Sequence, residues 1–279
     1  MDFVDRLIDL ALEEDLGAAG DITTQALVPE HAPGRAEVWA KEPLVLSGTR
    51  AFARVFTRLE PAAEVRFSEA DGARIPGKQM VGSVSASLRT LLVGERTALN
   101  ILQRTCGIAT LAARAADVVK GSKLRILDTR KTSPGMRGLS KEAVRAGGAS
   151  NHRFGLFDGV LIKDNHIAAV GGDVSEALRR ARANAPQLVK IEIEITRLEQ
   201  LTAAIAGGAD IVLLDNMDDA MVAQAVRIAA AGKVQLEVSG NVTLERLPRL
   251  AQIGVDFVSM GALTHSARAM DLSLEIVER

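Results

Sequence analysis

Basic side chains gather in one stretch of this sequence, and their types suit the binding of anions. Arginine offers a planar fork that fits carboxylates and phosphates, whereas lysine offers a compact charge. Glycines are interleaved with these cations and would let the backbone approach a ligand closely. The pattern predicts a polyanionic ligand, and a solvated charged loop is the alternative interpretation. The basic residues are Arg130, Lys131, Arg137, Lys141, Arg145, His152, Arg153, Lys163 and His166.

Two carboxylates further along the chain suggest a second kind of chemistry. Glu194 and Asp215 each stand at the end of an apolar run. Carboxylates in such places can bind ribose hydroxyls, hold Mg²⁺ together with substrate phosphates, or stabilise a developing positive charge. Pairing with the basic stretch is the alternative role.

Two short turns are candidates for phosphate binding. Ser239-Gly240-Asn241 and Met260-Gly261-Ala262 each follow an apolar run and precede a helix-like segment. Backbone N–H groups at the start of a helix attract phosphate, and late strand-to-helix loops are a common phosphate site in barrels. Simple tight turns would look the same in sequence.

The elements that must position these residues are predicted by a β/α rhythm from Leu124 onward. Short apolar runs that alternate with helix-like segments are typical of parallel strands buried on both faces. A complete eight-unit barrel needs about 250 residues, so six units favour an incomplete β/α (TIM-like) barrel, with a doubly wound sheet as the competing topology. Because the strands of a barrel end on one face, the polar residues should meet there. The runs are 124–127, 159–162, 189–195, 211–214, 234–238 and 255–258.

The first part of the chain reads as mixed α and β. Helical spacing covers residues 3–12 and 52–59, and strand-like runs cover 38–40 and 44–46. A long helical stretch runs from about Leu91 to Val119, where Gly94 and Gly107 could interrupt it.

Composition excludes several classes of protein. The 279 residues carry a net charge of -1, which gives no global attraction to nucleic acid or to an anionic membrane. No stretch is apolar enough to span a membrane and the N-terminus has no secretory pattern, so we expect a cytoplasmic protein. The single Cys106 forms no internal disulfide, and no zinc-type spacing or dinucleotide fingerprint is present, so no organic cofactor is expected. Residues 72–78 have P-loop spacing, but Gln79 replaces the required hydroxyl residue, and a β-turn is the better interpretation.

Several blocks in order along the whole chain resemble the quinolinate phosphoribosyltransferase family. Within them, Ser133, Met136 and Ala149 depart from the pattern without removing a charge. The blocks are Glu95 to Arg104, Asp128 to Arg137, Gly147 to Arg153, Leu161 to His166, Leu214 to Asn216 and Gly261 to His265.

The resemblance implies a reaction and an architecture. The reaction joins quinolinate and phosphoribosyl pyrophosphate to give nicotinate mononucleotide, pyrophosphate and carbon dioxide, with Mg²⁺, in NAD biosynthesis. The architecture is an N-terminal α/β sandwich domain over residues 1–107, a barrel domain over 108–265, and a C-terminal helix over 266–279 that returns to the first domain. At least a homodimer is implied, and the sequence does not decide between a homodimer and a hexamer.

The resemblance also implies roles for individual residues. Arg104 would reach into the neighbouring subunit's site, and Glu194 is preferred to Glu192 because it lies at the strand's end and matches the family's interval to the following Asp-Asn pair. Arg130, His152, Arg153 and Lys163 would bind quinolinate and other anionic groups, with Lys131 near the phosphoribosyl donor, and Thr129 would be a further substrate-binding residue. Glu194 and Asp215 would be the ribose and metal-side acids, so that Lys131, Lys163, Glu194 and Asp215 form the catalytic set. The phosphate cradle would be Ser239, Gly240, Asn241, Met260, Gly261 and Ala262.

Two other functions stay open on the sequence. A paralogue of the same fold, such as the molybdenum-transport-associated relative, would act on another acceptor. A non-catalytic sensor of a phosphorylated ligand would use the late glycine turns alone, although Glu194 and Asp215 would then place negative charge beside the ligand without benefit.

Overall fold

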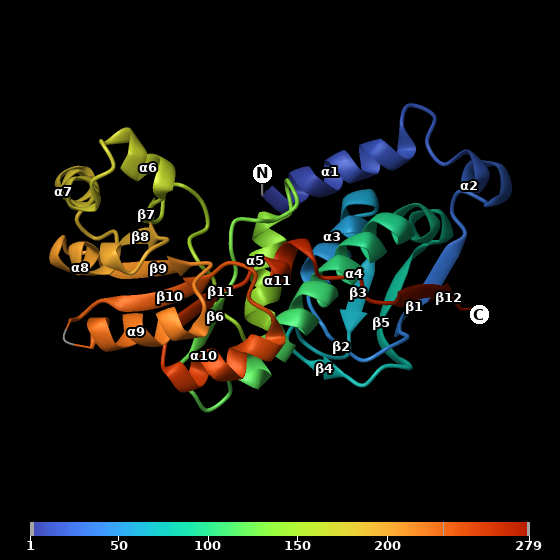
Figure 1. Cartoon of the computed structure of the whole chain (residues 1–279). Coiled ribbons are helices and arrows are strands. Elements are labelled where there is room, and N and C mark those ends of the chain that lie inside the picture. Colours follow the sequence, from blue (N-terminus) through green and yellow to red (C-terminus); the bar gives the residue numbers. More distant parts are fainter. Residues whose placement is uncertain (1–2, 231, 278–279) are drawn as a thin grey trace. The chain divides into compact units, whose positions relative to one another are not determined.

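The structure, a computed structural model, describes residues 3–230 and 232–277 (Figure 1). These residues divide into two compact units. The first unit contains the chain up to Ala113, Thr132–Gly148 and the chain from Leu263 onward. The second, which we call the barrel unit, contains Arg114–Lys131 and Ala149–Ala262. The division differs from the expected boundaries, because residues 132–148 belong to the first unit and Leu139 packs in its core.

The first unit is built on an antiparallel sheet with the strand order β12-β1-β5-β3 and a separate β2-β4 pair. Strands β1 and β5 alternate buried and more exposed positions, which is the period of a sheet with one face on the core. The strands are β1 (Pro33–Ala40), β2 (Leu44–Val45), β3 (Glu64–Phe67), β4 (Arg74–Ile75), β5 (Gln79–Ser87) and β12 (Leu272–Ile276). The helices are α1 (Phe3–Leu16), α2 (Ile22–Leu27), α3 (Thr49–Leu59), α4 (Leu88–Val118), α5 (Arg137–Ala146) and α11 (Ala262–His265). The end of α4, from Arg114, and the first residue of α11, Ala262, belong to the barrel unit.

Helix α4 runs without a break through Gly94 and Gly107, the two glycines that could have interrupted it. A Cβ atom at Gly94 would lie 2.9 Å from Cε1 of Phe56, and one at Gly107 would lie 1.8 Å from the carbonyl oxygen of Arg268. The glycines therefore permit close packing against the helix, and this gain outweighs their low helix propensity.

The expected C-terminal helix is wrong. Residues 272–276 form strand β12, which pairs antiparallel with β1 so that Val38 faces Leu274. The alternating burial of Leu272 and Leu274 is the period of a strand, and the pairing partner lies at the other end of the chain. A local sequence pattern does not reveal such a partner.

The barrel unit is built on six parallel strands in the order β6-β11-β10-β9-β8-β7. Along the chain β6 is the first of these strands and β11 is the last, and the two pair with each other, with Ser259 opposite Leu127. That order is the cyclic order of a β/α barrel opened between its first and second strands, and it excludes the doubly wound alternative. The strands are β6 (Arg125–Leu127), β7 (Val160–Ile162), β8 (Ile191–Ile195), β9 (Ile211–Asp215), β10 (Gln235–Ser239) and β11 (Phe257–Ser259).

Helices follow these strands and pack against their outer face (Figure 1). They are α6 (Asp164–Ala169), α7 (Val174–Asn184), α8 (Glu199–Ala206), α9 (Asp219–Ala229) and α10 (Leu247–Ile253), the last preceded by the 3₁₀ turn η1 (Leu244–Arg246). Asp173 and Asp218 cap α7 and α9 by accepting backbone N–H groups. In the described part of the chain, no helix has the length and apolar character needed to span a membrane.

The two faces of the six-stranded sheet differ in chemistry. Ile191, Ile193 and Ile195 are buried on one face of β8, and the intervening Glu192 and Glu194 lie on the other. The register continues the second face across Leu213 and Glu237, because Glu194 pairs with Leu213 and Leu213 pairs with Glu237. Carboxylates thus line the inner face of the open barrel.

Candidate active site

The expected site residues of the barrel unit stand at the C-terminal ends of its strands. Thr129, Arg130 and Lys131 follow β6, Lys163 follows β7, and Glu194 lies at the penultimate position of β8. Asp215 and Ser239 are the last residues of β9 and β10, and Gly240 and Asn241 form the turn after β10. His152 and Arg153 follow Ser150, which forms a single β-bridge with Leu127. Met260, Gly261 and Ala262 follow β11. Each strand of the sheet therefore contributes polar groups or a tight turn to one end of the unit.

Lys163 and Glu194 form an ion pair on the inner face. Leu161 pairs with Glu192 in the sheet, so Lys163 lies level with Glu194, and its Nζ is 2.6 Å from Glu194 Oε2. The Glu194 side chain is 12% exposed and that of Lys163 is 46% exposed. The carboxylate is therefore enclosed, while the ammonium group remains accessible to a ligand.

Asp128 fixes the segment that carries two of the cations. It is fully buried, and its carboxylate accepts the Asn151 side-chain N–H at 2.7 Å and the His152 backbone N–H at 2.8 Å. A buried carboxylate needs such donors, and here they set the path of the chain between β6 and β7.

Arg153 is oriented by the chain and lies in the field of a second guanidinium. Its Nη1 donates to the carbonyl of Gly159 at 3.1 Å. Burial lowers the pKa of Arg153, and the positive charge of Arg130 lowers it further. Two guanidinium groups held near each other in a partly buried place repel, and a bound anion would relieve that repulsion.

His152 contacts two buried glutamates that sequence reasoning did not include in the site. Its Nε2 lies 3.0 Å from Glu192 Oε2 and 3.8 Å from Glu237 Oε1. The signal was present in the sequence, because Glu192 and Glu237 interrupt strands that are otherwise aliphatic. Burial lowers the pKa of His152, but the hydrogen bond that its Nε2–H donates to Glu192 and the charges of both glutamates outweigh this effect, so the pKa is raised.

The turn after β10 packs closely against the turn after β9. Asp215 pairs with Ser239, and the Asn216 N–H donates to the Ser239 carbonyl at 3.0 Å. Asn216 and Asn241 have φ angles of 54° and 48°, and Gly240 has a φ of 93°. A Cβ at Gly240 would lie 2.2 Å from Asn216 Oδ1, so only glycine fits here.

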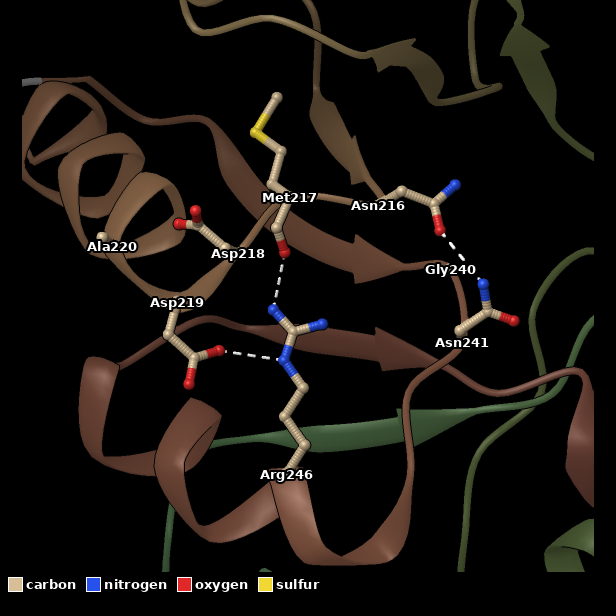
Figure 2. Close-up of a pocket in the computed structure, with 8 residues that line it drawn as sticks. All are labelled: Asn216, Met217, Asp218, Asp219, Ala220, Gly240, Asn241 and Arg246. Atoms are coloured by element: carbon tan, nitrogen blue, oxygen red, sulfur yellow. Dashed lines mark hydrogen bonds and ion pairs between the residues drawn. The ribbon is translucent and has the colours of Figure 1, made fainter.

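A pocket of about 520 Å³ opens between these two turns (Figure 2). Asn241 Nδ2 donates to Asn216 Oδ1 at 3.5 Å on one side of it. On the other side Arg246 donates to Asp219 Oδ1 at 2.9 Å and to the Met217 carbonyl at 2.6 Å. Besides Asn216, Gly240 and Asn241, its lining comprises Met217, Asp218, Asp219, Ala220 and Arg246, none of which the sequence pattern had indicated.

Several expected cations lie in the first unit. Arg104 is in α4, and its guanidinium donates to the carbonyls of Thr264 and Ala267 of the same unit. Arg137, Lys141 and Arg145 are on α5, also in the first unit. The basic stretch of the sequence is therefore divided between the two units.

Family models match nearly the whole chain. The model for the N-terminal domain of quinolinate phosphoribosyl transferase matches residues 21–106, and the model for the C-terminal domain of the same family matches residues 108–275. The chain belongs to the quinolinate phosphoribosyl transferase family. The expected resemblance is thus confirmed, and so is the fold class, a six-stranded parallel barrel sheet with a separate antiparallel sheet.

Known members of the quinolinate phosphoribosyl transferase family are similar over almost the full length. A nicotinate-nucleotide pyrophosphorylase [carboxylating] of Mycobacterium leprae is 44% identical over 270 residues, which is 95% of this chain and 94% of that protein. A probable enzyme of the same name from Bacillus subtilis is 40% identical over 97% of this chain and 92% of its own length. The crystal structure of the nicotinate-nucleotide pyrophosphorylase of Ehrlichia chaffeensis is 36% identical, covers 99% of both chains and has a TM-score of 0.93.

Proposed function

We propose that this enzyme transfers the phosphoribosyl group of phosphoribosyl pyrophosphate to the nitrogen of quinolinate, releasing pyrophosphate and carbon dioxide and forming nicotinate mononucleotide for NAD biosynthesis. The observation that carries the proposal is the cationic set Arg130, Arg153 and Lys163 at the carboxylate-lined end of a barrel of this family. Quinolinate brings two carboxylates and the donor brings several phosphate charges, and without cations their mutual repulsion would oppose binding.

On the acceptor side, Arg130, Arg153 and Lys163 would bind the carboxylates of quinolinate, with His152 beside them. The repulsion that lowers the Arg153 pKa is what a dicarboxylate would neutralise. In a homodimer or a hexamer, Arg104 of the neighbouring subunit would complete the acceptor site. That role follows from the family resemblance alone.

On the donor side, the turns after β10 and β11 would hold the 5′-phosphate, with Ser239, Gly240 and Asn241 in one turn and Gly261 in the other. The closely packed turn at Gly240 leaves backbone, and no side chain, next to a ligand. Thr129 and Lys131, after β6, would contact the pyrophosphate, and Asp215 would contact the ribose. The Lys131 N–H donates to Thr129 Oγ1 at 3.1 Å, which shapes this loop locally.

The chemistry would proceed in two steps. The bond from the anomeric carbon to the pyrophosphate oxygen breaks, its electron pair leaves with pyrophosphate, and the pyridine nitrogen supplies the pair for the new bond. Positive charge on the ribose in that transition state is stabilised by the enclosed Glu194 carboxylate. The adjacent carboxylate of the ring then leaves as carbon dioxide, the ring carbon keeps the electron pair, and a proton from water completes the product.

A Mg²⁺ ion held at this site would supply positive charge that neutralises the leaving pyrophosphate. Of the two acids expected to hold it, Asp215 fits better than Glu194. Asp215 is only partly buried at the end of β9, and one of its oxygens accepts from Asn216 Nδ2 at 2.8 Å. Glu194 is already paired with the Lys163 ammonium group, and the positive charge of that group would repel a metal ion bound to the same carboxylate.

The reaction itself tests the proposal. Purified enzyme would be given phosphoribosyl pyrophosphate, Mg²⁺ and quinolinate, and nicotinate mononucleotide and carbon dioxide would be measured together. Equal amounts of both products are expected, with nicotinate a much poorer acceptor because it leaves cations unpaired. If the enzyme bound phosphoribosyl pyrophosphate but formed no product from quinolinate, we would conclude that it acts on another acceptor. We also propose that the enzyme acts in the cytoplasm, where quinolinate and phosphoribosyl pyrophosphate would be available as metabolites.

A further inference from the structure

Two buried glutamates on the inner face of the barrel lack donors for most of their oxygens. Among the described residues, the buried side-chain oxygens without a hydrogen-bond partner are Glu192 Oε1 and both carboxyl oxygens of Glu237. Glu192 is 5% exposed and Glu237 is fully buried. An ionised carboxylate in such a place without donors costs several kcal/mol. The total negative charge of the Glu192 and Glu237 carboxyl groups must therefore be reduced in the folded protein.

The surroundings of Glu237 contain too little positive charge for two carboxylates. In the part of the chain that the structure describes, the titratable groups that act on Glu237 are Glu192 from β8 and His152 from the segment after β6, and the hydroxyl of Ser259 approaches it from β11. His152 Nε2 lies nearer to Glu192, at 3.0 Å, than to Glu237, at 3.8 Å. The imidazole therefore forms its hydrogen bond with Glu192, and the charge of Glu237 must be stabilised or removed in another way.

We propose that Glu237 is a neutral carboxylic acid in the folded enzyme and donates its O–H to Glu192, so that the two glutamates together position the His152 imidazole. This arrangement gives Glu192 a donor on each oxygen, from Glu237 and from His152 Nε2–H. It also removes one of two negative charges from a buried place. Burial and the charge of Glu192 raise the pKa of Glu237, in agreement with this geometry.

The chain of contacts continues from His152 to the anion site. His152 Nδ1 accepts the Arg153 backbone N–H at 2.7 Å, which favours the tautomer with its proton on Nε2. The bond from Nε2–H to Glu192 is also possible in the imidazolium form, whereas the bond from the Arg153 N–H requires the neutral imidazole, because Nδ1 of an imidazolium carries a proton. Through His152, the glutamate pair would set the place of Arg153. Glu237 is therefore a positioning residue, and this part of the inference rests on the proposed quinolinate site.

A bound metal ion is the main competing explanation of the cluster. One ligand atom from each of His152, Glu192 and Glu237 lies within 4.8 Å of the others. His152 Nε2 and Glu192 Oε2 already lie at hydrogen-bonding distance, 3.0 Å, and this contact needs no metal ion. Metal analysis of the purified enzyme separates the two explanations.

Infrared spectroscopy tests the protonation state without any substrate. The wild-type enzyme should show the carbonyl band of a buried carboxylic acid at neutral pH, and Glu237→Gln should lose it. The same loss is not expected in Val238→Ala, which trims the neighbouring residue on the opposite face of β10. Absence of the band, or stoichiometric zinc or manganese that Glu237→Gln releases, would overturn the proposal. This readout stands even if quinolinate proves not to be the acceptor.

Kinetics test the positioning role. Glutamine keeps a neutral donor at this place, so Glu237→Gln should retain a KM for quinolinate within about threefold of wild type. Glu237→Leu removes the donor and should raise that KM by roughly tenfold or more, with a smaller effect on the KM for the phosphoribosyl donor. The imidazole ¹⁵N signals of His152, assigned with His152→Asn, should shift in Glu237→Leu and stay in Glu237→Gln. Equal losses in both Glu237 variants would show that the ionised carboxylate is required and would contradict the proposal.

Discussion

Lys163 Nζ lies 2.6 Å from Glu194 Oε2 at the C-terminal end of the barrel sheet, although 31 positions separate the two residues in the chain. The sheet register produces this contact, because β7 and β8 are parallel neighbours and the two side chains lie level on the same face. The pair joins an accessible cation to an enclosed carboxylate. In the proposed reaction the cation would bind the acceptor and the carboxylate would face the positive charge that develops on the ribose.

Replacing either member of this pair should reduce turnover strongly. For Lys163→Ala and for Glu194→Gln we expect kcat to fall by about a hundredfold or more, because each change removes charge stabilisation from the transition state. Circular dichroism should stay near wild type, since the Lys163 side chain is 46% exposed, and the melting temperature of Lys163→Ala should fall somewhat because the enclosed Glu194 loses its partner. Initial rates over a range of both substrates measure the effect. Wild-type rates in both variants would refute the site assignment.

Gly240→Ala should damage the turn after β10, where we propose that the 5′-phosphate binds. The new Cβ would collide with Asn216 Oδ1, and the φ of 93° is costly for alanine, so we expect a loss of roughly 1–3 kcal/mol of stability. The KM for phosphoribosyl pyrophosphate should rise more than the KM for quinolinate. Gly171→Ala is a matched control, because Gly171 also has a positive φ, of 89°, but has open space around its Cβ. If Gly171→Ala raised the KM for phosphoribosyl pyrophosphate as much as Gly240→Ala does, backbone strain alone would explain the result.

The stability of the enzyme should fall as the pH rises through the neutral range. The folded state raises the pKa of Glu237 from its ordinary value of 4.5 to about 8, first through burial and then through the charge of Glu192. The unfolded chain releases this proton near pH 4.5, so the stabilising effect is complete below that pH and is lost progressively up to about pH 8. Chemical denaturation between pH 5 and 9 measures this loss, and Glu237→Gln should show a flatter profile. An identical slope in the variant would assign the loss to another group.

Mixed dimers should reveal whether Arg104 serves the neighbouring subunit. Neither Arg104→Ala nor Lys163→Ala alone should be active, but a heterodimer of the two contains one site in which both residues are intact. After random exchange of subunits, about a quarter of wild-type activity is expected. Activity would be measured before and after the two variants are unfolded and refolded together. No gain on mixing would mean that Arg104 acts within its own subunit or is structural, consistent with its bonds to Thr264 and Ala267.

The sequence predicted the barrel correctly because its signals are local. Each buried parallel strand is a short apolar run, and each ends in residues that such a strand would not otherwise carry, as at Lys163 and Asp215. The topology of parallel barrels then places these ends together without further information. Confirmation of the family followed from whole-chain comparison.

The errors concern contacts between distant segments. The C-terminal strand β12 is stabilised by β1, and α5 packs in the first unit although the neighbouring Lys131 belongs to the barrel unit. The choice of Glu194 rather than Glu192, made on the strand's end and on the family's interval, stays a prediction. The structure gives each of them a separate partner, Lys163 for Glu194 and His152 for Glu192.

The sequence by itself determined the residue types, the parallel strands and the end of the barrel at which the polar groups stand, because hydrophobic period and strand ends are properties of the local chain. Only the tertiary structure decided that His152, Glu192 and Glu237 form one cluster, that Gly240 admits no side chain, and that β12 completes the first sheet. Register and burial bring these residues together from distant parts of the chain. They also set the energy of each charge, since the cost of a buried carboxylate depends on which donors lie within reach.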